Sequence, residues 1–198
     1  MAKQTWVNLL NNGIPWQTAA GTQLATSAST ATISPQAAGP QDFILPTHDN
    51  GIQWYPGMTL KVEAAGTLGS AGTTSNLTVF LACGVSGTLA STLTTSGALT
   101  LGAGSVSGVE WTLEAWVRCT GIGSSGNTLA AAGRWLVGSA AGSNTGTLGT
   151  AAGTTMMMPE TAIAFNTYTA ATALGLRATL SAAFGNVQCN EFLIFQTG

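Results

Sequence analysis

The stretch that most constrains the fold is residues 109–119, VEWTLEAWVRC, where apolar and polar side chains alternate without a Gly or Pro. Successive side chains of a β-strand point to opposite faces, so this pattern predicts a long, half-buried strand with Trp111 and Leu113 in the core. Positions at helical spacing from Trp111 form no apolar stripe, which excludes an amphipathic helix here. The chain is therefore expected to build a β core around this strand.

Shorter apolar runs bounded by Gly-rich or Pro-containing turns predict further strands. They lie at residues 43–45, 59–65, 76–83, 88–93, 98–101, 128–137, 162–165, 173–180 and 187–196. The loop GIGSSGN predicts a hairpin between residues 109–119 and 128–137. Residues 138–155, which are mostly small and polar, are interpreted as a long surface loop. Because no helix is indicated, we predict an all-β fold, an antiparallel two-sheet sandwich. A jelly roll is the first choice and an immunoglobulin-like sandwich is the alternative.

The first 46 residues are predicted to be an extended N-terminal arm, followed by a β-sandwich domain at residues 47–198. Pro and Gly interrupt the arm, yet it carries the apolar residues Trp6, Leu9, Leu10 and Trp16. Large apolar side chains are seldom left in water. We therefore expect these four residues to dock on this subunit or on an adjacent one.

The composition points towards an assembled particle. Charged residues make up 6% of the chain, against about 25% in ordinary proteins. The apolar runs are too short for a membrane helix, and the start of the chain does not read as a secretory signal. We therefore expect the protein to stay in the cytosol where it is made, or to be packed there into something larger. A net charge of −2 offers no basic surface for nucleic acid. A surface of Thr, Ser, Gly and Ala instead suits close contact with neighbouring subunits.

Three cysteines, Cys83, Cys119 and Cys189, lie far apart within predicted strands. Their odd number and the absence of CxxC spacing argue against a disulfide framework and against a zinc site. We predict three buried, free thiols and no bound metal or cofactor.

Polar residues of the predicted loops give no catalytic motif. His48 and Asp49 are adjacent in THDNG, and adjacent residues rarely reach the geometry of a catalytic triad. Asp42, Asp49 and Asn50 carry oxygen ligands for calcium but lack the spacing of a calcium loop. These residues are interpreted as polar loop residues.

Two carboxylates of the central strand, Glu110 and Glu114, share one face. Four residues along a strand place them about 13 Å apart, farther than the carboxyl pair of a glycosidase. We expect them to pair with Arg134, Arg118 or Lys61 on neighbouring strands. The chain is therefore predicted not to be an enzyme.

Aromatic and methionine residues outside the predicted core are candidate contact residues. Trp54 and Tyr55 precede a Pro-Gly turn, and Trp116 lies on the polar face of the central strand. Such rings could stack on a sugar, or they could pack under the arm or at a subunit contact. The run Met156, Met157, Met158 after the long loop is a further candidate anchor.

Five stretches together resemble virion proteins of tailed bacteriophages, especially those that infect actinobacteria. They are TWVNLL with TAAGTQLATSASTATISP, YPGMTLKVEAAGTLGS, NLTVFLACGVSGTLA, VEWTLEAWVRCTGIGSSGNTLAAAGRWLVG and TALGLRATLSAAFGNVQCNEFLIFQ. The resemblance spans nearly the whole chain, and it carries no catalytic motif. It implies a β-sandwich structural protein, often trimeric, built into the capsid surface or the tail.

The function expected from this resemblance is that of a capsid decoration, or cement, protein on the outer capsid surface. It would bind the major capsid protein as a homotrimer and stabilise the shell. The alternative is a tail, baseplate or fibre component whose exposed face binds a cell-surface glycan. A secreted carbohydrate-active enzyme domain is disfavoured, since neither a signal segment nor a carboxylate pair is found.

Overall fold

The computed structural model describes residues 30–34, 44–45, 55–70, 75–85, 88–101, 106–123, 126–138, 154–165, 172–181 and 185–197. Every regular element in this part of the chain is a β-strand. The strands are β1 (Thr30–Thr32), β2 (Ile44–Leu45), β3 (Thr59–Ser70), β4 (Ser75–Val85), β5 (Thr88–Leu101), β6 (Val106–Gly123), β7 (Gly126–Val137), β8 (Thr154–Phe165), β9 (Thr172–Leu180) and β10 (Gly185–Gln196).

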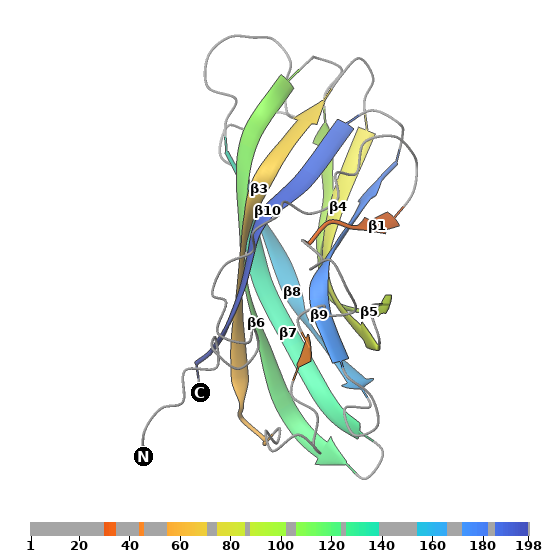
Figure 1. Cartoon of the computed structure of the whole chain (residues 1–198), viewed down its shortest axis with the longest axis vertical. Helices are drawn as coiled ribbons and strands as arrows, with labels where there is room; N and C mark the ends of the chain where they lie inside the picture. The colour runs from red at the N-terminus through yellow and green to blue at the C-terminus, as the bar shows by residue number, and fades with distance from the viewer. Residues whose placement is uncertain are drawn as a thin grey trace.

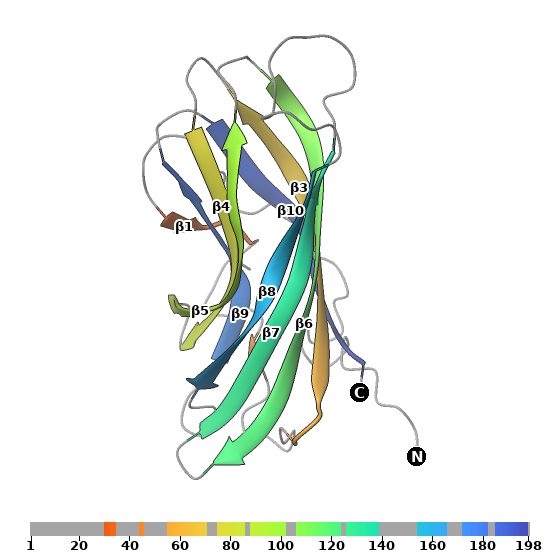
Figure 2. The same cartoon turned by 180° about the vertical axis from the view of Figure 1, so that it is seen from behind.

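The strands form two antiparallel sheets that pack face to face (Figures 1 and 2). The β6 sheet has the order β10-β3-β6-β7-β8, and the β4 sheet has the order β1-β9-β4-β5. The short strand β2 also pairs with β9. The prediction of an all-β, antiparallel two-sheet sandwich is confirmed. The jelly-roll arrangement stays a prediction, because residues 1–29 lie outside the described part of the chain.

The central strand of the sequence is also central in the structure. β6 lies between β3 and β7 and is the longest described strand, with 18 residues. Trp111 and Leu113 are 1% and 2% exposed, whereas Thr112 on the other face is exposed. Leu113 is opposite Trp135 of β7, which is fully buried. The predicted face assignment of this strand is therefore confirmed.

The predicted hairpin after β6 is confirmed as well. β7 returns antiparallel to β6, with paired positions running from Trp111 opposite Val137 to Gly123 opposite Gly126. The strand ladder thus extends beyond the predicted ends of both strands. This long hairpin fixes which β7 side chains lie beside the polar face of β6.

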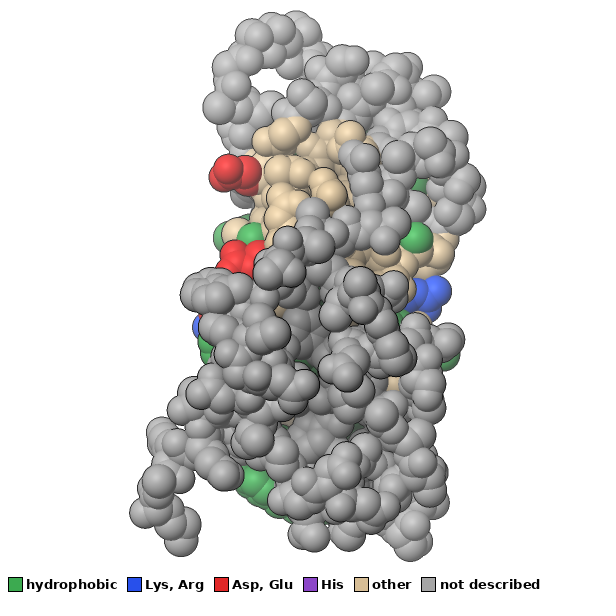
Figure 3. All heavy atoms as spheres, in the orientation of Figure 1, with side chains coloured by type: hydrophobic (Ala, Val, Ile, Leu, Met, Phe, Trp, Pro, Cys, Tyr) green, Lys and Arg blue, Asp and Glu red, His purple; other side chains and the backbone are tan. Residues whose placement is uncertain are grey.

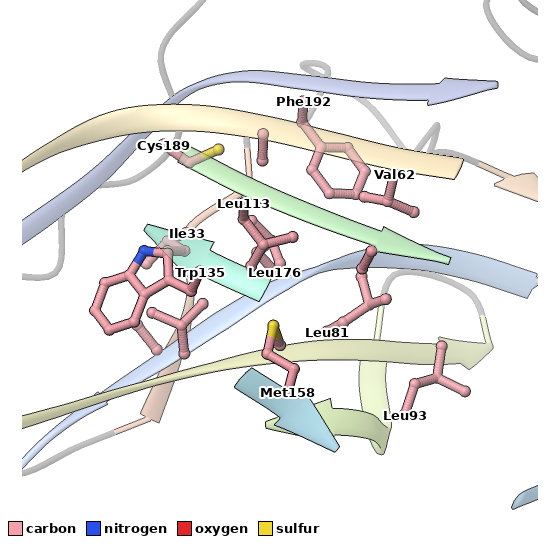
Figure 4. Close-up of a cluster of buried hydrophobic side chains, with 14 of the residues drawn as sticks. Ile33, Val62, Leu81, Leu93, Leu113, Trp135, Met158, Leu176, Cys189 and Phe192 are labelled. Atoms are coloured by element: carbon pink, nitrogen blue, oxygen red, sulfur yellow. The ribbon is translucent and has the colours of Figure 1, made fainter. Parts of the chain in front are cut away.

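Apolar side chains from both sheets meet between them and form one large core. Figure 4 shows part of it, in which Val62, Leu113, Trp135, Met158, Cys189 and Phe192 of the β6 sheet point towards Leu81, Leu93 and Leu176 of the β4 sheet and towards Ile33. Only Ser34, Ser75, Thr94 and Ser96 are buried polar residues in the described part of the chain. The core is therefore almost wholly apolar, as the alternating pattern predicts.

One margin of the sandwich is fastened by threonine side chains. Thr94 of β5 donates a hydrogen bond from its hydroxyl to the carbonyl oxygen of Pro159 in β8, at 2.7 Å. Thr161 of β8 donates in return to the carbonyl oxygen of Leu93 in β5. The edge strands of the two sheets, β5 and β8, are thereby joined to each other. We call this pair of contacts the β5–β8 seam.

The structure corrects the sequence analysis at two strands. Residues 88–93 and 98–101, expected to be separate strands, belong to the single strand β5. β8 begins at Thr154, so the end of the stretch interpreted as a loop is strand. Pro159 obscures β8 in the sequence, but it is tolerated because it lies on an edge strand at a register shift opposite Ala132.

Two short strands fall within the 46 residues predicted as an arm. β1 and β2 both pair with β9, and Ile33, next to β1, is fully buried in the core. Ile33 and Ser34 also donate backbone hydrogen bonds to the carbonyl oxygen of Leu176. This part of the N-terminal region is thus integrated into the sandwich.

Candidate functional site

The charged residues of the described chain are almost all on one sheet. Eight of the nine belong to the β6 sheet, namely Lys61, Glu63, Glu110, Glu114, Arg118, Arg134, Glu160 and Glu191. The ninth, Arg177 on β9, donates a hydrogen bond to the carbonyl oxygen of Leu89 at 2.9 Å. In Figure 3 the visible acidic side chains lie on the side that the β6 sheet occupies in Figure 1. We call the outer surface of the β6 sheet the charged face.

The strand register arranges the charged face in rows that cross the sheet. One row runs across all five strands as Leu193, Glu63, Glu114, Arg134 and Met157. Neighbouring residues of such a row lie about 5 Å apart, so their side chains interact directly. The row therefore places an ionic centre between two apolar ends.

Glu114 is the hub of this ionic centre. Its Oε1 lies 2.6 Å from Nζ of Lys61, and its Oε2 accepts hydrogen bonds from Nη2 and Nε of Arg134 at 2.6 and 3.0 Å. Nζ of Lys61 also lies 2.7 Å from Oε1 of Glu63. The predicted cross-strand pairing of Glu114 with Lys61 and Arg134 is confirmed, whereas Arg118 pairs with Glu160 at 3.5 Å.

These contacts shift the pKa of both charged partners. The hydrogen bond from Lys61, followed by that from Arg134, lowers the pKa of the Glu114 carboxyl. The hydrogen bond to Glu114, followed by that to Glu63, raises the pKa of the Lys61 ammonium. Both groups are therefore held in their charged forms at neutral pH.

The register brings together two carboxylates that the sequence analysis did not pair. Glu63 and Glu114 are directly opposite each other on β3 and β6, with Lys61 bound to both. A glycosidase needs one carboxyl that stays protonated as the acid, which requires a raised pKa. The lowered pKa of Glu114 is the opposite of that requirement, so this carboxyl is not suited to the role of the proton donor.

A hollow of about 390 Å³ lies on the charged face over the strands β10, β3, β6 and β7. Its floor is low because Ala65 and Thr112 carry short side chains. Glu191 and Leu193 border it on the β10 side, and Leu136 borders it on the β7 side. The hollow also includes Glu63, Glu114 and Arg134. It therefore offers both apolar surface and fixed hydrogen-bonding groups to a small ligand.

An aromatic ring lies beside this hollow. Trp116 is two residues from Glu114 on the same face of β6, and its side chain is 39% exposed. The Nζ atom of Lys61 lies 6.0 Å from the centre of the ring, within the range of a cation–π contact. The ring is thus held in place with part of its surface open to solvent.

The outer surface of the β4 sheet carries a single described charge, that of Arg177 on β9, which is half-buried and lies on the face opposite to its core neighbours Leu176 and Ala178. Its exposed described residues are Thr30, Asn76, Ala90, Thr92, Gly97, Ala98 and Thr100, which we call the uncharged surface. Neighbouring strands are linked there by side-chain hydrogen bonds, between Thr30 and Thr179 at 2.5 Å and from Thr100 to Asn76 at 3.0 Å. Some of the polar side chains of this surface therefore already have hydrogen-bond partners within the same sheet.

Several of the candidate contact residues named in the sequence analysis lie outside the described part of the chain. Trp6, Leu9, Leu10, Trp16 and Trp54 lie outside the described residues, as do His48 and Asp49. Tyr55, which precedes the turn into β3, is 45% exposed. Its role as a contact residue stays a prediction.

The three methionines do not form one exposed patch. They lie in the strand β8, so their side chains alternate between its two faces. Met157 is 71% exposed, whereas Met158 is buried and Met156 packs against the core. The expectation of an exposed anchor is therefore wrong for Met158, and Met157 is the only one of the three that projects from the charged face.

The described cysteines are all free thiols and all buried, as predicted. Burial raises the pKa of Cys83 and of Cys189 to about 12, and it also raises the pKa of Cys119. No cluster of three or more potential metal ligands is found among the described residues. Within the same residues, no helix could span a membrane.

Comparison of the chain with models of known protein families, with curated proteins and with solved structures finds no match. The candidate site therefore rests on its own geometry. This geometry is a sandwich with a charged, hollowed face on one sheet and, on the other, an outer surface whose single described charge is that of Arg177.

Proposed function

We propose that this chain is a non-enzymatic structural protein of a tailed-bacteriophage virion, a decoration (cement) protein that binds the outer surface of the capsid. The observation that carries the proposal is the division of charge between the two sheets, with eight of the nine described charged residues on the β6 sheet. The sequence resemblance to phage virion proteins supplies the kind of particle.

The physical argument concerns the cost of removing a surface from water. Burying an unpaired charge costs several kcal/mol, whereas hydroxyl groups that are already hydrogen-bonded cost much less. The uncharged surface carries Thr30 and Thr100, each with a hydrogen-bond partner on a neighbouring strand. Arg177, the single described charge on this side, already donates a hydrogen bond to the carbonyl oxygen of Leu89. The uncharged surface is therefore the one that docks on the major capsid protein, and the charged face remains in solvent and keeps the particle soluble.

The proposed assembly is a homotrimer in which several weak contacts act together. Each copy contributes its uncharged surface and the apolar residues Trp6, Leu9, Leu10 and Trp16 of the arm. Burial of one such side chain is worth about 1.5–3 kcal/mol. Linked contacts of this size give tight attachment without any single strong site.

The test is a binding assay of purified protein on capsids that lack it. Thr92→Lys and Thr100→Lys place a charge on the uncharged surface, and we expect at least about ten-fold weaker binding from each. Thr112→Lys is the matched control, because it puts the same charge on an exposed position of the charged face. Equal binding of all three variants, or a loss confined to Thr112→Lys, would show that the docking surface is assigned wrongly.

Copy number separates the capsid from the tail. Quantitative mass spectrometry of purified virions should find hundreds of copies per particle if the protein decorates the capsid. A handful of copies would instead place it in the tail, the baseplate or a fibre.

A second candidate function is favoured by the hollow and by Trp116 beside it. A neutral sugar could lie with its apolar face on the ring while its hydroxyls bond to Glu114 and Arg134. This would suit a tail or fibre component that recognises a cell-surface glycan. Screening on a glycan array tests it, since binding should disappear in Trp116→Ala and persist in Met157→Ala, which removes another exposed apolar side chain from the same face.

A further inference from the structure

The start of β5 leaves the plane of its own sheet. β4 lies between β5 and β9 in the β4 sheet, yet β5 also contacts β9 directly. In Figures 1 and 2 the first part of β5 bends outwards, to the side away from the β6 sheet. The pairing of β4 with β5 is irregular here, with register shifts between Leu81 and Ala82 and between Cys83 and Val85. Such irregularities bend a strand, and they let this part of β5 lie over the outer surface of the sheet.

Leu89 is the residue of β5 that reaches β9. Gly175 of β9 faces outwards, because its neighbours on both sides along the strand belong to the core. Ala82, which is opposite it on β4, has only a short side chain. A Cβ atom at Gly175 would lie 2.7 Å from Cδ1 of Leu89, so the leucine side chain fills the notch that the two small residues leave. Leu89 and Ala82 form a buried cluster of their own, separate from the main core.

The N-terminal segment 30–34 is held at the same place. The backbone amides of Ile33 and Ser34 donate hydrogen bonds to the carbonyl oxygen of Leu176. The amide of Leu176 donates in return to Oγ of Ser34, at 3.1 Å. The same Cβ atom on the glycine of the notch would lie 2.6 Å from this Oγ. Leu89 and Ser34 therefore lie side by side over one glycine of β9.

The contact of Leu89 is built so that it can open by itself. Its side chain is buried on the outer surface of the β4 sheet and not between the two sheets. Its carbonyl oxygen accepts a hydrogen bond at 2.9 Å from Nη1 of Arg177, whose side chain is only half-buried. A small unit outside the main core opens at a lower free energy than the whole domain unfolds.

We propose that the start of β5 is a releasable clasp over the N-terminal segment 30–34. In the closed form Leu89 covers Ser34 and locks the segment on β9. In the open form Leu89 leaves the notch, and the segment is free to detach together with Ile33, which is fully buried when the clasp is closed. The clasp thus sets how often this part of the N-terminal region separates from its own sandwich. This inference does not depend on the proposed binding to a capsid.

Native-state hydrogen–deuterium exchange at low urea concentrations tests the clasp in the unaltered protein. The reporters are the amides of Ile33, Ser34 and Leu176, whose hydrogen bonds join the segment to β9. A local opening exposes little surface, so exchange of these amides should depend weakly on urea, whereas exchange of the β6 amides should depend strongly on it. An equal dependence on urea would overturn the proposal, because the segment would then detach only when the whole domain unfolds.

Two substitutions should open the clasp without touching the segment. Leu89→Ala empties the notch, and Arg177→Met removes the hydrogen bond to the carbonyl oxygen of Leu89 while it keeps a long side chain. Each should speed exchange of the three reporter amides, Leu89→Ala by at least about ten-fold, and leave the β6 amides unchanged. Unchanged exchange of the reporters in Leu89→Ala would overturn the proposal.

Leu93→Ala is the matched control, because it removes another buried leucine of β5, one that belongs to the main core. The cavity that it leaves weakens the whole sandwich, so it should speed exchange in β6 as well as at the reporters. The same pattern of exchange in Leu89→Ala and Leu93→Ala would contradict a separate clasp.

Discussion

The indole of Trp111 occupies the space that a side chain at Gly66 would need. The two residues are directly opposite each other on β6 and β3, and a Cβ atom at Gly66 would lie 2.6 Å from Cζ2 of Trp111 and 2.0 Å from the carbonyl oxygen of Gln188. The ring is held there by a hydrogen bond from its Nε1 to the carbonyl oxygen of Thr67 at 3.2 Å. The buried position of the Trp111 ring thus requires a glycine at residue 66.

Gly66→Ala should therefore destabilise the protein strongly. The added methyl group meets backbone on one side and a buried ring on the other, and overpacking of this kind costs about 1–3 kcal/mol or more. Gly121→Ala is the control, because a Cβ atom there would find its nearest neighbour at 3.8 Å. Urea unfolding should show a lower midpoint for Gly66→Ala alone. Equal midpoints for the two variants would contradict the packing described here.

The two faces of β6 should respond differently to the loss of a tryptophan. Trp111→Ala removes a fully buried ring and should lower the free energy of unfolding by about 3–5 kcal/mol. Trp116→Ala removes a ring that is 39% exposed on the charged face and should cost less than about 1.5 kcal/mol. Thermal unfolding of both variants checks this difference. If Trp116→Ala is the more damaging change, the assignment of the faces is wrong.

The buried thiols should be unreactive in the folded protein. Only the thiolate reacts with iodoacetamide, and burial holds the pKa of Cys83 and Cys189 at about 12 and raises that of Cys119. At pH 8 we expect no alkylation of the native protein and three alkylated residues in denaturant, counted by mass spectrometry. Rapid labelling of the native protein would mean that one of these strands opens readily.

The same pKa shifts predict the behaviour of the protein at alkaline pH. A raised pKa in the folded state means that the folded protein binds protons that the unfolded chain has lost. The stability from these thiols is therefore fully present below the ordinary pKa of about 9 and is lost as the pH rises towards 12. Urea unfolding at a series of pH values should show this decline, and substitution of Cys83 and Cys189 by Ala should reduce it.

The lowered pKa of Glu114 predicts that the stability of the protein decreases at acidic pH. Its pKa is lowered in the folded protein, so its contribution is present above the ordinary pKa of a glutamate and is lost as the pH falls through the lowered value. Glu114→Gln should therefore be less stable than the wild-type protein at pH 7, by no more than about 1 kcal/mol for such a surface network. The difference should vanish in strong acid. A difference that persists there would show that the loss is one of packing and not of charge.

Much of the sandwich could be predicted because its strands alternate in the sequence. The pattern of residues 109–119 and the turn GIGSSGN define β6, β7 and the hairpin between them without any tertiary information. β8 was only half predicted, because three consecutive methionines and Pro159 hide its alternation. The short strand β2 lies within the predicted strand at residues 43–45. The strand β1 has too few residues to show a period, and it forms because β9 offers it a partner.

The candidate site was harder to predict than the fold. The ion-pair partners of Glu114 could be predicted, because the chain has only five Lys and Arg residues. The direct opposition of Glu63 and Glu114, however, depends on how β3 and β6 are aligned, and a shift of one residue would turn one of them to the other face. The hollow depends on the register of four strands together. Such sites arise from tertiary pairing and have no local signal in the sequence.

The β5–β8 seam also has a mechanical consequence. The hydroxyl hydrogen bonds of Thr94 and Thr161 join the two sheets along one margin of the sandwich. β1 and β10, the first and last strands that the structure describes, lie towards the opposite margin (Figures 1 and 2). A pull applied through β1 and β10 would therefore peel strands from that margin, loading their hydrogen bonds one after another. A pull applied across β5 and β8 would load the seam as a whole and should require a larger force.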